Sequence, residues 1–315
     1  MAPISNGLVK TTPSEKPEMK VLLLGKNGQV GWELQRSLAT LGEVISLDRG
    51  AVDGICGDLL NSEALRATIR RIAPDVIVNA AAYTLVDKAE SEKEVAMQVN
   101  ALAVEILAEE AFRNGSWLVH YSTDYVFDGA GSTAWCEDDT VAPINHYGVT
   151  KAAGERAIIS SGCKYLIFRT SWVYGTRGNN FARSMLRLGS ERSELNVIAD
   201  QIGAPTGAEL IADSTVVALR QALSSPELAG IYHLAAAGTA SWYDFATLVI
   251  DLGRANGNPM MVQTINPIPT SQYPTPARRP LNSRLDTEKL RETFSIHLPD
   301  WRSGVTRMLK EVLEK

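Results

Sequence analysis

The fold is decided by the stretch Lys20-Val-Leu-Leu-Leu-Gly25-Lys-Asn-Gly28-Gln-Val-Gly31, a strand-sized apolar run that ends in three spaced glycines. The glycines open a predicted helix over residues 29–40. In such a turn Gly25 permits the tight bend, Gly28 lets the backbone approach a pyrophosphate, and Gly31 lets the helix pack on the strand. Because a helix N-terminus attracts anions, the stretch predicts a strand, turn and helix that bind a dinucleotide, although its spacing is GxxGxxG rather than GxGxxG.

Beyond this stretch, strand-like and helix-like patterns alternate along the chain. The apolar runs are continuous, as in strands that helices cover on both faces. This alternation predicts an α/β fold, a doubly wound parallel sheet of the Rossmann type, with a smaller C-terminal substrate-binding lobe. Strands are expected over 21–24, 44–47, 76–79, 117–122, 165–170 and 231–234, and helices over 29–40, 61–71, 92–113, 210–224, 242–256, 301–313 and from 146 onward.

The sequence also predicts how these elements divide into domains. We expect a flexible tail over 1–18, a dinucleotide-binding domain over 19–172 with an interleaved return near 208–236, and a substrate-binding lobe over 173–207 and 237–315. The segment 267–280 contains five prolines and therefore suits a loop or lid rather than a helix or a central strand.

Composition excludes several classes of protein. The 315 residues carry a net charge of −5, and their Lys and Arg are scattered, which argues against a nucleic-acid partner. No apolar run approaches the ~18 residues of a membrane span. Three widely spaced cysteines and four histidines without ligand spacing favour neither a disulfide framework nor a zinc site. We expect a soluble cytoplasmic protein.

Charged and small residues mark the ends of the next strands. Asp48 ends the second predicted strand, where a carboxylate can bind ribose hydroxyls and favour NADH, whereas the adjacent Arg49 favours the 2′-phosphate of NADPH. Both cofactors therefore remain open. Asp58 either accepts from the adenine amino group or lies in an exposed loop. The small residues Ala80, Ala81 and Ala82 either leave room for a ligand or serve close helix packing.

A second motif predicts proton transfer. Tyr147 and Lys151 are four residues apart at the start of a predicted helix, so their side chains share one face. A nearby ammonium is expected to stabilise the phenolate and bring the pKa of the tyrosine toward neutrality. Thr123, at the end of a strand, can donate to a carbonyl oxygen. With the glycine-rich turn, these residues predict hydride transfer to or from a carbonyl.

In these motifs the chain resembles the extended short-chain dehydrogenases/reductases that act on nucleotide sugars. Related dehydratases need an Asp-Glu pair after the threonine, but here Tyr125 follows Asp124, which favours reduction over elimination. Further segments resemble the dTDP-4-dehydrorhamnose reductase family from about Lys20 to the C-terminus: Phe168-Arg-Thr-Ser-Trp172-Val-Tyr-Gly175, Gly178-Asn-Asn-Phe181, Asp200-Gln201-Ile-Gly203-Ala-Pro205-Thr206 and Tyr273-Pro-Thr-Pro-Ala-Arg278-Arg279-Pro280-Leu-Asn282-Ser283-Arg284-Leu285.

The resemblance implies reduction of the 4-keto group of dTDP-4-dehydro-β-L-rhamnose to dTDP-β-L-rhamnose by NADPH or NADH. It makes Tyr147 the proton donor, Lys151 the partner of the nicotinamide ribose, and Thr123 the group that orients the carbonyl. The implied substrate-binding residues are Thr123, Asp124, Trp172, Arg278 and Arg279. The alternatives are that Trp172 is a core residue and that either arginine is merely solvated. Cofactor contacts are expected from Gly25, Gly28, Gln29, Val30, Gly31, Asp48, Arg49, Asp58, Leu59, Ala80, Ala81, Ala82, Tyr83, Tyr121, Tyr147 and Lys151.

The same resemblance implies a homodimer and a Mg²⁺ ion held by Glu33, Glu209 and Glu311. The alternative is that these glutamates are surface residues of helices and bind no metal. Two other functions remain open. One is reduction of a different nucleotide-linked 4-ketosugar, because the sequence does not identify which nucleotide base the protein recognises. The other is a non-catalytic role like that of the regulatory β subunit of methionine adenosyltransferase, which resembles this reductase family.

Overall fold

The computed structural model describes residues 19–314, so the tail predicted over 1–18 lies outside the described residues. The first part of the chain alternates strands and helices: β1 (Lys20–Leu24), α1 (Gln29–Leu38), β2 (Glu43–Leu47), α2 (Ser62–Ile72), β3 (Val76–Asn79), α3 (Val86–Ala89), α4 (Lys93–Met97), α5 (Ala103–Asn114), β4 (Trp117–Thr123), α6 (His146–Ser161) and β5 (Lys164–Thr170).

Six parallel strands form the main sheet in the order β10-β5-β4-β3-β1-β2. The sixth, β10 (Gly230–His233), comes late in the chain and pairs with β5. The strand order reverses between β1 and β3, and ligands of such sheets bind at the carboxyl ends beside this reversal. The predicted doubly wound parallel sheet is confirmed.

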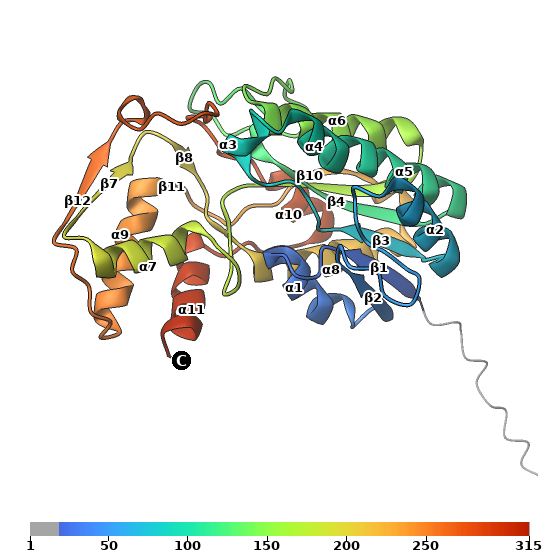
Figure 1. Cartoon of the computed structure of the whole chain (residues 1–315), viewed down its shortest axis with the longest axis horizontal. Coiled ribbons are helices and arrows are strands. Elements are labelled where there is room, and N and C mark those ends of the chain that lie inside the picture. The colour runs from blue at the N-terminus through green and yellow to red at the C-terminus, as the bar shows by residue number, and fades with distance from the viewer. Residues whose placement is uncertain (1–18, 315) are drawn as a thin grey trace, which may run out of the picture.

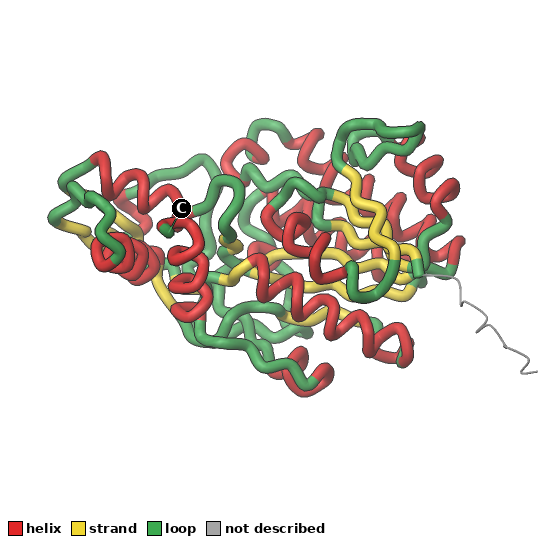
Figure 2. Tube along the Cα trace, turned by 90° about the horizontal axis from the view of Figure 1, so that it is seen from below, coloured by secondary structure: helices red, strands yellow, loops and turns green. Residues whose placement is uncertain are grey.

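Successive residues of each strand enter opposite cores, because side chains alternate across a sheet. In β1, Val21 and Leu23 face a core completed by α1, α8 (Ala208–Ser224) and α10 (Glu288–Phe294), whereas Leu22 and Leu24 face one built with α2, α5 and α6. All four side chains are fully buried. Helices therefore cover both faces of the sheet, as Figure 2 shows from below.

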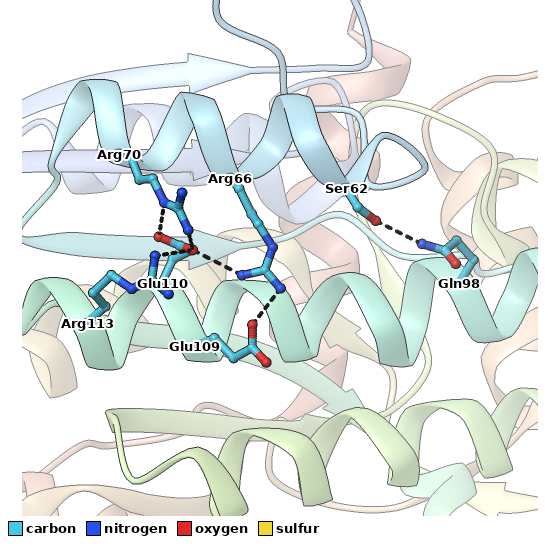
Figure 3. Close-up of polar contacts among 7 residues, drawn as sticks. All are labelled: Ser62, Arg66, Arg70, Gln98, Glu109, Glu110 and Arg113. Atoms are coloured by element: carbon cyan, nitrogen blue, oxygen red, sulfur yellow. Dashed lines mark hydrogen bonds and ion pairs between the residues drawn. The ribbon is translucent and has the colours of Figure 1, made fainter.

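An ion-pair cluster joins α2 to α5, on the side of the sheet that these helices cover (Figure 3). Glu110, only 1% exposed, accepts from Arg66 at 3.0 Å and from two nitrogens of Arg70 at 2.7 and 2.9 Å. Arg113 lies 3.4 Å from the same carboxylate. These arginines hold the pKa of Glu110 below its usual range. The cluster thus neutralises a carboxylate that would be costly to bury alone.

A smaller set of elements lies beyond the sheet, at the left in Figure 1. It has its own core, which includes Phe245 and Trp301, both at most 1% exposed. Its elements are α7 (Phe181–Glu191), β7 (Glu194–Ile198), α9 (Trp242–Ala255), β12 (Thr264–Ile268) and α11 (Trp301–Leu313), with the short strands β6 (Val173–Tyr174), β8 (Ile202–Gly203), β9 (Thr206–Gly207) and β11 (Ala240–Ser241).

Two expected elements differ in detail. The helix predicted over 92–113 is interrupted by a π-helical turn, Gln98–Leu102, between α4 and α5. The turn accommodates Asn100, whose buried side chain binds the backbone of Tyr83 and the hydroxyl of Thr150. The proline-rich segment expected as a loop begins inside β12. Among the described residues that strand pairs with β7 alone, so Pro267 sits in an edge strand, where proline is tolerated.

Within residues 19–314, every helix is too short or too polar to cross a membrane.

Candidate functional site

The turn after β1 is shaped for close approach of a ligand. Gly25 has φ +85°, and a Cβ on Gly31 would lie 2.0 Å from the carbonyl oxygen of Gly25. Gly28, the N-cap of α1, carries no capping side chain, and the first turn of the helix has no acidic residue. The backbone N–H groups at this helix end therefore stay available to an anion. Gln29 and Val30 begin the helix, and Gln29 accepts a hydrogen bond from Asn180 at 3.0 Å.

Asp48 directly follows β2 at the same edge of the sheet. Its carboxylate accepts from the Asn27 amide at 2.8 Å and the Gly50 backbone at 2.9 Å, and Lys26 lies 3.8 Å away. These donors, led by Gly50, lower the pKa of Asp48. Arg49 is exposed beside it.

Asp58 and Leu59 follow a short loop, and their side chains lie in different surroundings. The Asp58 carboxylate accepts from the Leu60 backbone at 3.1 Å, which closes a local turn. The Leu59 side chain is 4% exposed and belongs to the core beneath the sheet. Any contact of Leu59 with a cofactor must therefore come from its backbone.

The end of β3 continues this edge with a loop of small residues. Ala80, Ala81 and Ala82 are all partly exposed. The Asn79 side chain accepts from the Ala81 backbone at 3.2 Å, which fixes the loop where it leaves the strand. Farther on, the Tyr83 hydroxyl donates to Glu92 at 2.6 Å, and this bond raises the pKa of Tyr83 to about 12.

Thr123 and Asp124 lie at the carboxyl end of β4, in the middle of the sheet. The Thr123 hydroxyl donates to Asp124 Oδ1 at 3.0 Å and accepts from the Tyr125 backbone at 3.2 Å. Asp124 is 2% exposed, and its Oδ2 makes no hydrogen bond within residues 19–314. Burial therefore raises the pKa of Asp124 to about 6, an effect that the nearby Ser283 and Thr123 hydroxyls offset only in part.

Tyr147 and Lys151 lie in the first turns of α6, which is capped by Asn145. Tyr147 packs edge-on against Tyr125, with ring centroids 5.9 Å apart. Its pKa is raised by burial and by the charge of Asp124, while Thr123 lowers it in part. This corrects the expected direction. Lys151 does not lower the pKa of Tyr147 in this arrangement, and its Nζ is hydrogen-bonded to the Tyr121 carbonyl oxygen.

Lys151 is 1% exposed, and its Nζ donates to the Tyr121 carbonyl oxygen at 2.6 Å. The same Nζ lies 3.1 Å from Nε2 of His120, whose Nδ1 lies 3.2 Å from the Asn79 amide. Burial lowers the pKa of Lys151 to about 8. Sequence reasoning missed both Asn79 and His120. A histidine in a buried strand, three positions before Thr123, is the only signal that could have indicated them.

Tyr121, predicted as a cofactor contact, makes its side-chain contact elsewhere. Its hydroxyl lies 2.8 Å from that of Thr215 in α8, and burial raises its pKa. Only its carbonyl oxygen faces Lys151.

Trp172 follows β5 and lies beyond the sheet edge. It has φ +48°, a conformation that is uncommon for a bulky residue and often found at functional sites. Its ring stacks on Trp242 with centroids 3.7 Å apart and an interplanar angle of 12°. Trp242 is itself fixed by a 3.0 Å hydrogen bond to Gln201. One face of the Trp172 ring is thus covered by protein.

The two arginines predicted to clamp a diphosphate have different surroundings. Arg278 is exposed, and its carbonyl oxygen accepts from Asn145. Arg279 is ion-paired with Asp87 at 2.7 Å and lies 3.5 Å from the Tyr125 hydroxyl. A clamp by Arg279 must therefore share that guanidinium with Asp87.

Glu33, Glu209 and Glu311 come from α1, α8 and α11. Burial raises the pKa of Glu33, and the charges of the other two carboxylates raise it further. Glu209, however, binds Arg307 at 2.6 Å. Residues 19–314 contain no group of three or more His, Cys, Asp or Glu side chains arranged to hold a metal ion. The predicted magnesium site is thus not supported.

Comparison with known proteins agrees with this geometry. The family model described as RmlD substrate binding domain matches residues 19–314. The dTDP-4-dehydrorhamnose reductase of Escherichia coli K12 is 57% identical over 294 residues, covering 93% of this chain and 98% of the relative. That of Burkholderia thailandensis is 48% identical over 303 residues, covering 94% and 100%.

Among solved structures, dTDP-4-dehydrorhamnose reductase from Bacillus anthracis, in complex with NADP, is 35% identical with a TM-score of 0.82, over 93% of this chain and 99% of that one. The resemblance noted in the sequence is confirmed, and the chain belongs to the RmlD family of dTDP-4-dehydrorhamnose reductases.

Proposed function

We propose that this protein reduces the 4-keto group of dTDP-4-dehydro-β-L-rhamnose with NADPH or NADH, giving dTDP-β-L-rhamnose. The observation that carries the proposal is the meeting of two motifs at one edge of the sheet. Thr123 ends β4 and Tyr147 and Lys151 begin α6, while the glycine turn ends β1. A proton donor and a nucleotide-binding turn at the same edge suit reduction of a carbonyl.

The residues beside the switch between β1 and β3 fit a dinucleotide. The uncapped N-terminus of α1 suits the pyrophosphate, and Asp48 and Arg49 suit the adenosine ribose. Lys151 is assigned to the nicotinamide ribose, and the solved relative from Bacillus anthracis contains NADP. Further contacts are assigned to Gln29, Val30, Asp58, Leu59, Ala80, Ala81, Ala82, Tyr83 and Tyr121. When bound, the reduced nicotinamide supplies the hydride.

The chain's own residues supply the proton and the orientation. Thr123 donates to the 4-keto oxygen, and Tyr147 gives its proton to that oxygen as negative charge develops there. Because burial and Asp124 raise the pKa of Tyr147, the phenol reaches the reaction still protonated. Tyr125 occupies the position where a dehydratase needs a carboxylate, so the site lacks the base for elimination.

The substrate-binding part of the proposal assigns the sugar to Asp124 and Trp172 and the diphosphate to Arg278 and Arg279. It also divides the chain by role. Residues 19–172, with a return near 208–236, bind the dinucleotide, and residues 173–207 and 237–315 bind the sugar nucleotide. In this assignment Thr123, at the carboxyl end of β4, lies between the dinucleotide and the sugar nucleotide.

The experiment supplies the protein with dTDP-4-keto-6-deoxyglucose, the matching 3,5-epimerase, and either NADPH or NADH. Oxidation of the nicotinamide and formation of dTDP-rhamnose are followed together. We expect turnover by the wild-type protein and almost none by Tyr147→Phe. Absence of turnover together with retention of a stoichiometric partner protein would favour a regulatory role instead.

Parallel reactions with UDP- and GDP-linked 4-ketosugars address the remaining alternative. A protein that prefers one of these substrates is a reductase of another nucleotide sugar. The homodimer, the magnesium ion at Glu33, Glu209 and Glu311, and the cytoplasmic location rest on the resemblance alone. Light scattering and activity after chelation test the first two.

A further inference from the structure

Asn79, His120 and Lys151 form a buried polar array, and the proposed reaction assigns no role to Asn79 or His120. Asn79 on β3 and His120 on β4 are paired neighbours in the sheet. Both side chains are 1% exposed, as is Lys151. Buried polar groups of this kind are costly unless their hydrogen bonds are satisfied, so the direction of each bond is informative.

The direction can be followed from the backbone inward. The Ala81 N–H can only donate, and it lies 3.2 Å from Asn79 Oδ1, so this atom of the side chain is the amide oxygen. The amide nitrogen then faces His120 Nδ1 at 3.2 Å. Because an amide NH₂ also only donates, Nδ1 is the acceptor, and the ring proton lies on Nε2.

This tautomer directs an N–H at Lys151. Nε2 of His120 lies 3.1 Å from Nζ, which also donates to the Tyr121 carbonyl oxygen. An ammonium has three donors and no lone pair, whereas the neutral amine has one lone pair that can accept. The contacts of Ala81 with Asn79, of Asn79 with His120 and of His120 with Lys151 are therefore mutually consistent when Lys151 is a neutral amine.

We propose that His120 is a positioning residue which, oriented by Asn79, donates to Lys151 and stabilises its neutral amine form. The catalytic meaning of this array rests on the proposed function. After Tyr147 gives its proton to the substrate oxygen, the resulting phenolate must regain one. The Lys151 ammonium returns that proton and becomes an amine, which is the form that His120 binds.

Other groups near Lys151 do not provide this effect. Glu155, one turn later in α6, acts in the opposite direction and raises the pKa of Lys151. Its carboxylate is engaged by Arg169 of β5 at 2.7 and 3.0 Å, within a buried ion pair. Tyr147 shares the helix, and His120 faces Lys151 from β4. Burial is the main cause of the lowered lysine pKa. The hydrogen bond that we assign to His120 Nε2 acts in the same direction, because a donor to the neutral amine favours that form.

The tautomer can be read directly from ¹⁵N-labelled histidine by NMR of the ligand-free protein, near pH 9, about one unit above the Lys151 pKa. We expect His120 to carry its proton on Nε2. His233 is a matched control because it is equally buried, but its Nδ1 faces the Asp286 carbonyl oxygen at 3.1 Å, which requires the opposite tautomer. A proton on Nδ1 of His120 would overturn the proposal.

Signals are assigned with His120→Gln and His233→Gln. Should either fail to fold, His146→Gln and His297→Gln remove the two less buried histidines, which leaves the two buried signals. One Nε2–H and one Nδ1–H signal are then expected, and two Nδ1–H signals refute the inference. The readout does not use turnover, so an inactive protein with the expected tautomer would contradict the proposed function and leave this inference intact.

A second variant reverses the array. Asn79→Asp keeps the bond from Ala81 but offers His120 a carboxylate, which can only accept, so the ring proton moves to Nδ1. Nε2 then accepts from the Lys151 ammonium. We expect a switched tautomer and an alkaline limb of the kcat profile about one pH unit higher. Asn196→Asp, which adds the same charge on β7, should change neither. An unchanged limb with a switched tautomer contradicts the coupling.

Discussion

Replacing Asp124 by asparagine should make the protein more stable and less active. The carboxyl group is 2% exposed, its Oδ2 makes no hydrogen bond within residues 19–314, and its pKa rises from 3.8 to about 6. That rise corresponds to a penalty on the order of 3 kcal/mol for keeping the folded protein charged. An amide removes the charge, and its NH₂ can donate to the nearby Ser283 hydroxyl.

The sign of the pH dependence follows from linkage. Below 3.8 the carboxyl is protonated in both folded and unfolded chains and carries no penalty. The penalty appears as pH rises and is complete above about 6, where both states are ionised. The variant should therefore exceed the wild type in stability most strongly near pH 8 and least near pH 4.

The assay is thermal unfolding followed by circular dichroism at several pH values. At ~2.1 cal/mol/K of unfolding entropy per residue, 3 kcal/mol corresponds to roughly 5 °C in the midpoint near pH 8. Asp128→Asn, at an exposed position, is the control and should shift it little. Equal or lower stability of the Asp124 variant near pH 8 would refute the reasoning, as would a gain that is constant with pH.

Four further variants test the packing of the glycine turn, the ion-pair cluster and the two proposed binding sites. In Gly31→Ala the clash with the Gly25 carbonyl oxygen costs about 3 kcal/mol, and the better helix propensity of alanine offsets about 1 kcal/mol, so scanning calorimetry should show a lower melting temperature. In Gly28→Ala the new Cβ lies 3.3 Å from the same oxygen, so the variant should melt nearly normally. It should nevertheless bind NADPH at least about tenfold more weakly by titration calorimetry. Glu110→Gln should lose about 1–3 kcal/mol in urea unfolding at pH 7, and the difference should vanish as pH falls below 4.5 through the lowered pKa of Glu110, because that stability belongs to the ionised carboxylate. In Gly203→Ala the new Cβ would lie 2.8 Å from the Trp172 ring, so steady-state kinetics should show a higher KM for the sugar nucleotide; a higher Kd for NADPH would contradict that assignment.

The sheet could be predicted because its strands are continuous apolar runs that need no distant information. The π-helical turn at Asn100 could not, since one extra residue hardly alters helical periodicity. Tyr147 and Lys151 were visible through their spacing. Their surroundings were not, because the contacts of Lys151 with His120 and of Arg279 with Asp87 join residues 31 and 192 positions apart.

The late return of α8 and β10 to the sheet constrains how this protein can be taken apart. Residues 208–234 cover one face of the six-stranded sheet and supply its outermost strand, yet they follow α7 and β7 in the chain. A truncation at Trp172 would leave Leu34 and Leu38 facing water and β5 as an open edge. Exchange of the smaller set of elements between relatives therefore requires splice points on either side of this return, because a single cut at Trp172 leaves the six-stranded sheet without α8 and β10.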